Sequence, residues 1–254
     1  MYLPEFLNLG AGFGKYFRAR PALDDDLRRA VYRIRHSVYC EELGYEPIRP
    51  DGLEFDAFDD RSLHCLLQAK NGGEYIGCVR LVLAGQGDAC LLPFETLCAD
   101  SLDRSIVDPA RLDRRRIAEV SRLAVISRYR RRRGEQKQPV GIDDSDFGTA
   151  DRPRFPYIAV GLYLGMLALA QRNGLETLFM LTEQRLARQL TRLGVRLQRV
   201  GAPIEHRGLR YPSMMSVPEV IDGLGFFVRP MFDVIAGEIG AAYTASQPAV
   251  IRAS

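Results

Sequence analysis

The sequence has 254 residues, of which 46% are hydrophobic and 26% charged, and it contains no tryptophan. This length and composition are those of an ordinary globular protein that buries a core of its own, as one large α/β domain or two small ones. The formal net charge of +3 is too small to indicate nucleic-acid binding by itself.

The first half of the chain is predicted to combine one helix with three strands. Acids in the first turn and apolar residues at helical spacing mark the helix, and Gly44 follows its end. The turn sequence NGGE predicts a hairpin between two apolar strands. In chain order we expect a helix over 24–43, strands over 62–70 and 75–84, a partly helical link over 91–98 and a strand over 117–126.

The second half begins with a segment of different character. Residues 134–156 are rich in Gly, Pro and Asp and have almost no periodicity, which predicts a long inserted loop or lid. Beyond it we expect a helix over 157–172, a strand over 175–182, an amphipathic helix over 184–194, a strand over 195–201 and a tail containing a helical segment. Glycines 161 and 165 would let the first of these helices pack closely on the sheet. This order predicts a mixed α/β sheet flanked by helices.

Cysteines and apolar segments indicate the compartment. The five cysteines show no CxxC pair and no zinc-site spacing, so we expect reduced packing thiols and no metal site. The most apolar run, residues 157–170, is 14 residues long, which is short of the ~20 needed to span a bilayer. The opening MYLPEFLNLG lacks the pattern of a signal peptide. We therefore expect a soluble, cytoplasmic protein without a transmembrane segment.

Charge is unevenly distributed along the chain. Residues 111–133 hold ten arginines against Asp113 and Glu119, whereas residues 51–60 hold five acids and no base. Such blocks indicate an anionic partner at one place and a cation or amine at another, although each block taken alone also fits a solvated face.

Several charged residues interrupt segments that are otherwise apolar. Arg80 lies within one predicted strand, and Glu119 and Arg122 lie within another. Alternation along a strand places Glu119 and Ser121 on one side and Arg122 on the other, unless a bulge intervenes. A buried charge is costly unless it is paired, so these residues and the acids Asp56 and Asp59 are expected either to form a structural ion-pair network or to build an active site.

The layout resembles that of GNAT acyltransferases, in which a turn after the fourth strand holds the pyrophosphate of the donor. The corresponding turn here, Arg130 to Gly134, keeps one glycine of the family's turn and lacks the second. The polar residues resemble, in order, the signature of acyl-homoserine-lactone synthases: Arg35, Tyr39, Asp56, Asp59, Arg80, Phe94, Glu119 and Arg122. Tyr39 and Tyr45 stand where those enzymes usually have Phe and Trp, and the interval from Phe94 to Glu119 is longer here.

The chain resembles N-acyl amino acid synthases more closely, and it resembles the acyltransferases associated with PEP-CTERM/exosortase systems more closely still. The resemblance covers about residues 25–215 and is carried by RHSVYCEELGYE, EFDAFDDRSLHCLL, EVSRLAVISRYRRR, FPYIAVGLYLGMLAL and LARQLTRLGVRLQRVG. It implies a GNAT-like domain over 1–215, with 134–156 as an inserted loop, and a C-terminal helical extension over 216–254.

The resemblance also implies a reaction. An acyl-carrier protein would deliver a long-chain acyl-phosphopantetheine thioester, which is a donor substrate rather than a bound cofactor, to a small amine acceptor. Glu119 would be the general base, Asp56 and Asp59 would hold the ammonium or order a water, and Arg122 and Arg80 would bind a carboxylate or fix the acids. The remaining expected roles are network or acceptor contacts for Arg35, Tyr39 and Phe94, and docking of the acidic carrier protein by Arg128, Arg130, Arg131, Arg132 and Arg133.

A conventional acetyl-CoA-dependent transferase is disfavoured by the missing second glycine of the turn. Two further alternatives stay open from the sequence. One is synthesis of acyl-homoserine lactone from S-adenosylmethionine. The other is a non-catalytic regulator that binds nucleic acid through the arginines of 111–133, although no nucleic-acid-binding motif accompanies them. His64 is expected to be a core residue, whereas His206, Arg207 and Arg210 are candidates for the lining of an acyl or acceptor pocket.

Overall fold

The computed structural model describes residues 9–85, 91–130, 148–149, 152–153 and 157–246. Its centre is an eight-stranded mixed sheet with strand order β1-β2-β3-β4-β7-β10-β8, and β9 pairs with β10 beside it. The strands are β1 (Phe17–Pro21), β2 (Ser62–Ala69), β3 (Tyr75–Leu83), β4 (Ile117–Val125), β7 (Thr177–Thr182), β8 (Gln198–Arg199), β9 (Ile204–Glu205) and β10 (Leu209–Ser216). The predicted mixed α/β sheet is thus confirmed. Neighbouring strands are antiparallel except β4 and β7, which are parallel.

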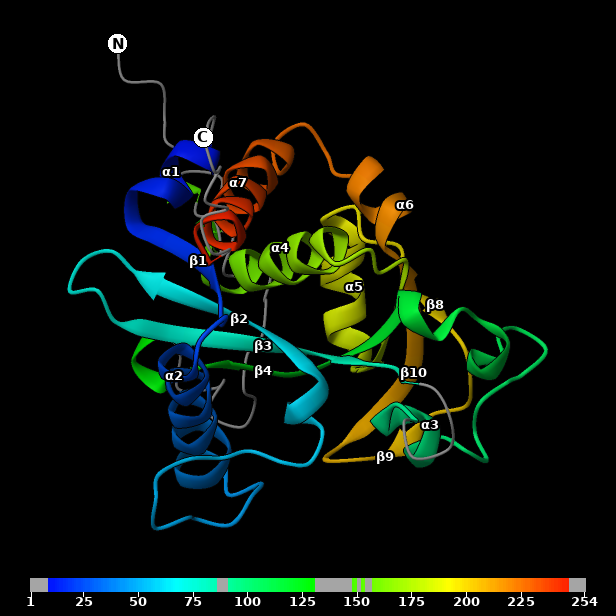
Figure 1. Cartoon of the computed structure of the whole chain (residues 1–254). Coiled ribbons are helices and arrows are strands. Elements are labelled where there is room, and N and C mark those ends of the chain that lie inside the picture. The colour runs from blue at the N-terminus through cyan, green and yellow to red at the C-terminus, as the bar shows by residue number, and fades with distance from the viewer. Residues whose placement is uncertain (1–8, 86–90, 131–147, 150–151, 154–156, 247–254) are drawn as a thin grey trace, which may run out of the picture.

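Helices cover both faces of the sheet (Figure 1). They are α1 (Leu9–Tyr16), α2 (Asp25–Arg35), α3 (Pro93–Leu97), α4 (Tyr157–Arg172), α5 (Gln184–Arg192), α6 (Val217–Asp222) and α7 (Arg229–Ser246). The main apolar core joins α1, α4 and α7 to one face, while α2 packs against the other through a smaller cluster that contains Val31 and Val38. Among the described residues, no helix has both the length and the apolar character needed to cross a bilayer.

Most predicted elements are present with small shifts at their ends. The helix predicted over 24–43 is α2 followed by a π-helical segment, His36–Glu42. The strand predicted over 195–201 shrinks to β8, because the chain pairs with β10 at only two positions, Gln198 and Arg199. The sequence analysis had no element for α1, β1 or β10. Of the predicted loop 134–156, only the short pair β5 (Gly148–Thr149) and β6 (Arg152–Pro153) is described in its interior.

The C-terminal helix α7 is part of the main core. Met231, Phe232 and Ile235 are buried in the same cluster as Phe13 of α1 and the apolar residues of α4. Glu238 of α7 accepts a hydrogen bond from the backbone N–H of Ala19 on the edge strand β1, at 2.9 Å. The predicted helical extension is therefore helical in the described part, and it covers both a face and an edge of the sheet.

Two glycines of α4 allow the close packing that the sequence predicts. A Cβ atom at Gly161 would lie 2.8 Å from the ring of Phe13, and one at Gly165 would lie 2.8 Å from the Sγ of Cys65 on β2. Because Cys65 is fully buried, its thiol has little room to move.

We expect Gly165→Ala to lower the free energy of unfolding by about 1–3 kcal/mol, since overpacking outweighs the gain in helix propensity. The matched control is Gly237→Ala on α7, where the new methyl group meets nothing within 4 Å. It should stabilise the protein by about 0.5–1 kcal/mol. Urea denaturation of both variants measures the difference, and two stabilised variants would contradict the packing account.

Candidate active site

The candidate site lies where two neighbouring strands of the sheet separate. β4 and β7 pair only from Ile117 to Glu119, opposite Thr177 to Phe179. Beyond this point a cavity of about 370 Å³ is lined by residues 119–123 of β4 and 180–182 of β7. Tyr39 and Tyr163 also line it, and they belong to the helical segments on opposite faces of the sheet. The separation of β4 and β7 therefore makes the cavity accessible to side chains from both faces.

A bulge in β4 brings Arg122 into this cavity. The pairing of β3 with β4 shifts register between Cys78 and Arg80, and Arg122 has a left-handed backbone with φ of +51°. Simple alternation would have sent Arg122 to the opposite side from Glu119 and Ser121, but all three line the same cavity. A non-glycine residue in this conformation is strained, and such strain is common at functional sites.

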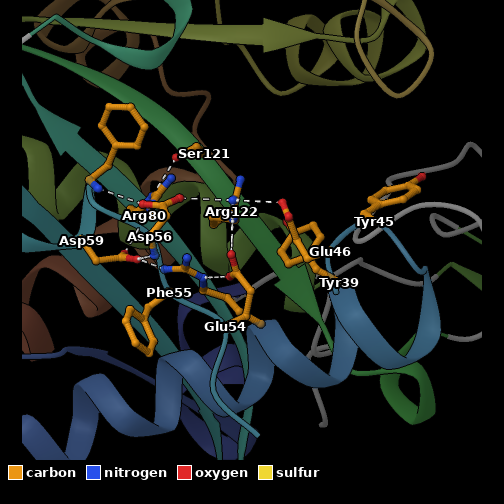
Figure 2. A network of polar contacts seen from close by, with 12 residues as sticks. Tyr39, Tyr45, Glu46, Glu54, Phe55, Asp56, Asp59, Arg80, Ser121 and Arg122 are labelled. Carbon is orange, nitrogen blue, oxygen red and sulfur yellow. Dashed lines mark hydrogen bonds and ion pairs between the residues drawn. The ribbon is translucent and has the colours of Figure 1, made fainter. Parts of the chain in front are cut away.

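Three arginines and four acids form a network beside the cavity (Figure 2). Arg35 is fully buried; it donates to Glu54 through Nε and to Asp59 through Nη1, the latter at 2.6 Å. Arg80 donates to Asp56 at 2.6 Å, to Asp59 at 3.1 Å and, through Nε, to the hydroxyl of Ser121 at 3.0 Å. Burial without partners would make each of these charges costly, and pairing offsets that cost.

Arg122 connects this network to a further acid. Its guanidinium lies 3.2 Å from carboxylate oxygens of Glu46, Glu54 and Asp56. The predicted network of Arg80, Arg122, Asp56 and Asp59 is thus present. Glu46 and Glu54 also belong to it, and neither was singled out from the sequence.

Asp59 differs from Asp56 in its surroundings. Burial raises the pKa of Asp59, but the hydrogen bond and charge of Arg35, together with the charge of Arg80, outweigh burial and hold that pKa at about 2. Its side chain is 3% exposed, whereas that of Asp56 is 27% exposed and lines the cavity. Asp59 therefore orients Arg35 and Arg80, and Asp56 is the aspartate of the pair that a ligand can reach.

Glu119 lines the cavity but stands apart from the ion pairs. Its Oε2 accepts a hydrogen bond from the backbone N–H of Phe94 at 2.6 Å, and within the described residues it makes no salt bridge. Burial raises the pKa of Glu119 to about 8, against the lowering effects of the Phe94 N–H and the charge of Arg80. The sequence allows Glu119 either a place in a structural ion-pair network or a role as general base. In the structure it lies next to the start of α3, outside the ion pairs of the described residues.

Aromatic residues fix the edges of the site. Phe94 is buried and stacks on Phe179 of β7, with ring centroids 4.5 Å apart, and this contact holds the N–H that binds Glu119. Tyr39 donates from its hydroxyl to the carbonyl of Leu123 in the bulge, at 2.8 Å. Burial raises the pKa of Tyr39, so it remains a protonated donor.

Two further hydroxyl groups line the cavity. Tyr163 of α4 and Thr182 of β7 are buried, and their hydroxyl oxygens have no hydrogen-bond partner among the described residues. Buried polar groups are normally paired, so both are available to polar atoms of a bound molecule. A cluster of three or more His, Cys, Asp or Glu suited to a metal ion is absent from the described part of the chain.

The arginine-rich stretch 111–133 is less uniform than its sequence. Six of the arginines that the structure describes there form salt bridges with carboxylates: Arg114, Arg115, Arg116, Arg122, Arg128 and Arg130. Arg128 is exposed and pairs with Glu74, whereas the side chain of Arg130 is 7% exposed and pairs with Glu42. The predicted docking residues Arg131, Arg132 and Arg133 lie outside the described residues.

A second arginine-rich surface borders the cavity directly. Residues 184–199 contain five arginines and no acid, and all five are exposed: Arg185, Arg188, Arg192, Arg196 and Arg199. Arg185 and Leu186 of α5 line the cavity. The signal in the sequence that marks this surface is a run of five arginines without any acid.

Comparisons with known proteins agree with this architecture. Residues 34–137 match a family described as acetyltransferase (GNAT) domain. An acyl-homoserine-lactone synthase of Pseudomonas fluorescens is 36% identical over 67 residues, which are 25% of this chain and 34% of that protein. The chain thus aligns with about a third of the length of this curated relative.

Solved structures extend the likeness to most of the chain. The acyl-homoserine-lactone synthase LasI has a TM-score of 0.55 at 16% identity, covering 82% of this chain and 96% of LasI. The CoA-dependent acyl-homoserine lactone synthase MesI has a TM-score of 0.55 at 23% identity, and the match covers 84% of this chain and 95% of MesI. FeeM, an N-acyl amino acid synthase from uncultured soil microbes, has a TM-score of 0.52 at 18% identity, and the match covers 82% of this chain and 95% of FeeM.

These findings define the class first: the chain has the GNAT acyltransferase fold, with a GNAT domain matched over 34–137. Within that class, a stretch of 67 residues is similar to an acyl-homoserine-lactone synthase, and the chain shares its fold with LasI and with the N-acyl amino acid synthase FeeM. The association with PEP-CTERM/exosortase systems remains a prediction from sequence resemblance.

His64 should make the protein acid-labile. It is buried beside the network, its Nε2 lies 3.5 Å from Asp59, and burial lowers its pKa to about 3. The folded state binds this proton less readily than the unfolded state, in which the pKa is 6.5. The contribution of neutral His64 to the free energy of unfolding is therefore complete above pH 6.5 and is lost as the pH falls from 6.5 toward 3. The slope is at most about 1.4 kcal/mol per pH unit for this one proton.

We expect His64→Gln to reduce the loss of unfolding free energy between pH 6.5 and 4, as measured by urea denaturation at several pH values. An unchanged slope in the variant would show that other groups cause the acid lability.

Proposed function

We propose that the chain is an N-acyltransferase that moves a long-chain acyl group from the thioester of an acyl-carrier protein to the amine of an amino acid or similar small acceptor. The observation that carries the proposal is Glu119, a buried carboxyl group with a pKa of about 8 in a cavity formed where β4 and β7 separate. A general base is most effective when its pKa lies near the working pH.

The reaction needs one proton to be removed before the bond is made. An α-ammonium group has a pKa of about 8, so Glu119 takes a proton from it and leaves a neutral amine. Glu119 passes this first proton to solvent. The amine nitrogen then attacks the thioester carbonyl and forms the C–N bond, and Glu119 accepts the second proton from that nitrogen. This second proton passes to the departing thiolate as the C–S bond breaks, so that one proton is released to solvent overall. The products are an amide and a thiol.

The network holds the acceptor end of this reaction. Asp56 and Glu46 face the cavity and attract an ammonium group, whereas Asp59, Arg35 and Arg80 keep Asp56 in place. Tyr163 and Thr182 supply free hydroxyl groups to polar atoms of the acylated arm.

An acidic carrier protein is the proposed source of the thioester. Of the exposed arginines of α5, Arg185 lines the cavity and Arg188 and Arg192 lie further along the same helix. A carrier protein bound there by charge complementarity would place its arm near the opening. Arg128, together with Arg131, Arg132 and Arg133, stays part of the proposed docking surface, and Arg130 holds Glu42 instead. The sequence resemblance extends the proposal to a role beside PEP-CTERM/exosortase systems.

A second candidate acceptor is S-adenosylmethionine, which would make the chain an acyl-homoserine-lactone synthase. The local match to the Pseudomonas fluorescens synthase favours it. Mass spectrometry separates the two, because one reaction gives a linear N-acyl amino acid and the other gives a lactone and methylthioadenosine.

Glu119→Gln should reduce the rate of amide formation by about 10²–10⁴-fold, because the general base is lost. In the unmodified protein kcat/KM should rise with pH up to about 8 and then level, since Glu119 must be deprotonated to act. The assay uses hexadecanoyl carrier protein with a pool of amino acids and S-adenosylmethionine, and acetyl-CoA as the control donor.

The matched control is Glu176→Gln, whose carboxylate pairs with Arg116 outside the cavity, and it should keep full activity. A thioester that stays intact with every acceptor, in a protein that binds DNA, would replace this proposal with the regulatory one.

Reversing charge on α5 should weaken the docking of the donor. The double variant Arg188→Glu/Arg192→Glu should raise KM for hexadecanoyl carrier protein at least about tenfold at low salt and leave turnover of a small acyl-pantetheine thioester unchanged. Arg115→Glu, at an exposed position outside the cavity lining, is the control. Equal KM values for all three proteins would place the donor elsewhere.

A further inference from the structure

The turn between β9 and β10 is built to hold one arginine over the cavity. The N–H of His206 donates to the carbonyl of Gly208 at 3.0 Å, and Arg207 between them has a left-handed backbone with φ of +53°. Arg210 donates to the carbonyls of His206 and Arg207 and forms a 2.7 Å salt bridge with Glu183. A strained turn held by these side-chain contacts places Arg207 in a defined position.

Arg207 reaches across to the opposite wall. Its guanidinium donates to Glu46 at 2.6 Å and to the carbonyl of Tyr45 at 3.2 Å, and lies 5.1 Å from the centre of the Tyr45 ring. The same oxygen of Glu46 accepts from Arg122 at 3.2 Å. Glu46 is therefore the point at which the β9–β10 turn meets the acid–arginine network.

The charges of the cavity lining are segregated. Near β3 and β4 the lining acids Glu46, Asp56 and Glu119 face Arg80 and Arg122, both of which also bind carboxylates behind the lining. On the other side, the lining charges are Arg185, Arg207, Arg210 and a single acid, Glu183. An ammonium group is stabilised on the first side and a carboxylate on the second.

Arg207 is the arginine best placed to exchange its partner for a ligand. Arg122 contacts three carboxylates and Arg80 two, with side chains 19% and 2% exposed. Arg207 contacts one carboxylate in the described structure, that of Glu46, and its side chain is 28% exposed. Binding a ligand carboxylate at Arg207 costs one ion pair, and Glu46 keeps Arg122 as a partner.

We propose that Arg207 binds the carboxylate of the acceptor while Glu46 and Asp56 bind its ammonium group, so that the acceptor is an α-amino acid with a free carboxylate and not a simple amine. This inference rests on the proposed acyl transfer and assigns the acceptor's chemical class. One oxygen of Glu46 accepts hydrogen bonds from both Arg122 and Arg207, so Glu46 and Arg207 lie close together. An ammonium at Glu46 and a carboxylate at Arg207 would therefore be as near to each other as they are in an α-amino acid. Arg80 and Arg122, the arginines that the sequence suggested for this carboxylate, position the acids.

The test compares an amino acid with its carboxamide, which keeps the amine and removes the negative charge. Each of the twenty amino acids is first offered with hexadecanoyl carrier protein, and the best acceptor is then compared with its carboxamide. The unmodified protein should favour the carboxylate at least about tenfold in kcat/KM. Arg207→Ala should lose about 10- to 100-fold with the carboxylate and less than about threefold with the carboxamide, which removes the preference.

The control is Arg115→Ala, at an exposed position outside the cavity lining, and it should behave as the unmodified protein does. Equal use of carboxylate and carboxamide by the unmodified protein would overturn the assignment without any variant. A preference that survives Arg207→Ala, or equal losses with both acceptors, would overturn it as well. All three results leave acyl transfer intact, whereas absence of any amide product would overturn the proposed function itself.

Discussion

The pairing of buried guanidinium groups with carboxylates is the interaction on which the site depends. Arg35, the last residue of α2, is fully buried, and it is held by Glu54 and Asp59. Glu54 also contacts Arg122, and Asp59 also contacts Arg80. These contacts fix the two arginines, and both arginines in turn hold Asp56. Because an unpaired charge at this depth would cost several kcal/mol, each member can stay ionised only while its partners remain in place. Asp56, which faces the cavity, is thus held by two arginines whose other partners, Glu54 and Asp59, are buried behind the cavity lining.

The sheet provides the second half of the site through a break in regular pairing. β4 leaves β7 after Glu119, and the bulge at Arg122 turns a side chain that alternation would send elsewhere into the resulting cavity. The outcome is a cavity in which Glu119 is buried near paired charges without being part of a pair. Its raised pKa follows from that position, and the proposed proton transfer follows from the pKa.

Hydrophobic periodicity and turn residues were enough to predict the hairpin β2–β3, strand β4 and helices α4 and α5. Each of these elements has a clear hydrophobic period or a turn signal at its end. The elements α1, β1 and β10 were not predicted because their hydrophobic periodicity is weak. β1 and β10 are strands because long β2 and β7 offer them unpaired edges, and short segments with mixed residues depend on such a template. The identity of the acid–arginine set was likewise accessible, since charged residues inside apolar segments are costly unless they are used.

From the sequence alone we could predict that this chain forms a mixed α/β sheet and that Asp56, Asp59, Arg80, Glu119 and Arg122 come together, as an ion-pair network or as an active site. Only the tertiary structure decided that Glu119 would stand outside the ion pairs, that Glu46 and Glu54 would enter them, and that Arg207 would reach the cavity from a turn some 160 positions along the chain from Glu46. The physical reason is that residue type and local period set which groups need a partner. Which partner each one finds depends on strand order, a bulge and a left-handed turn, and these arise when distant segments pack together.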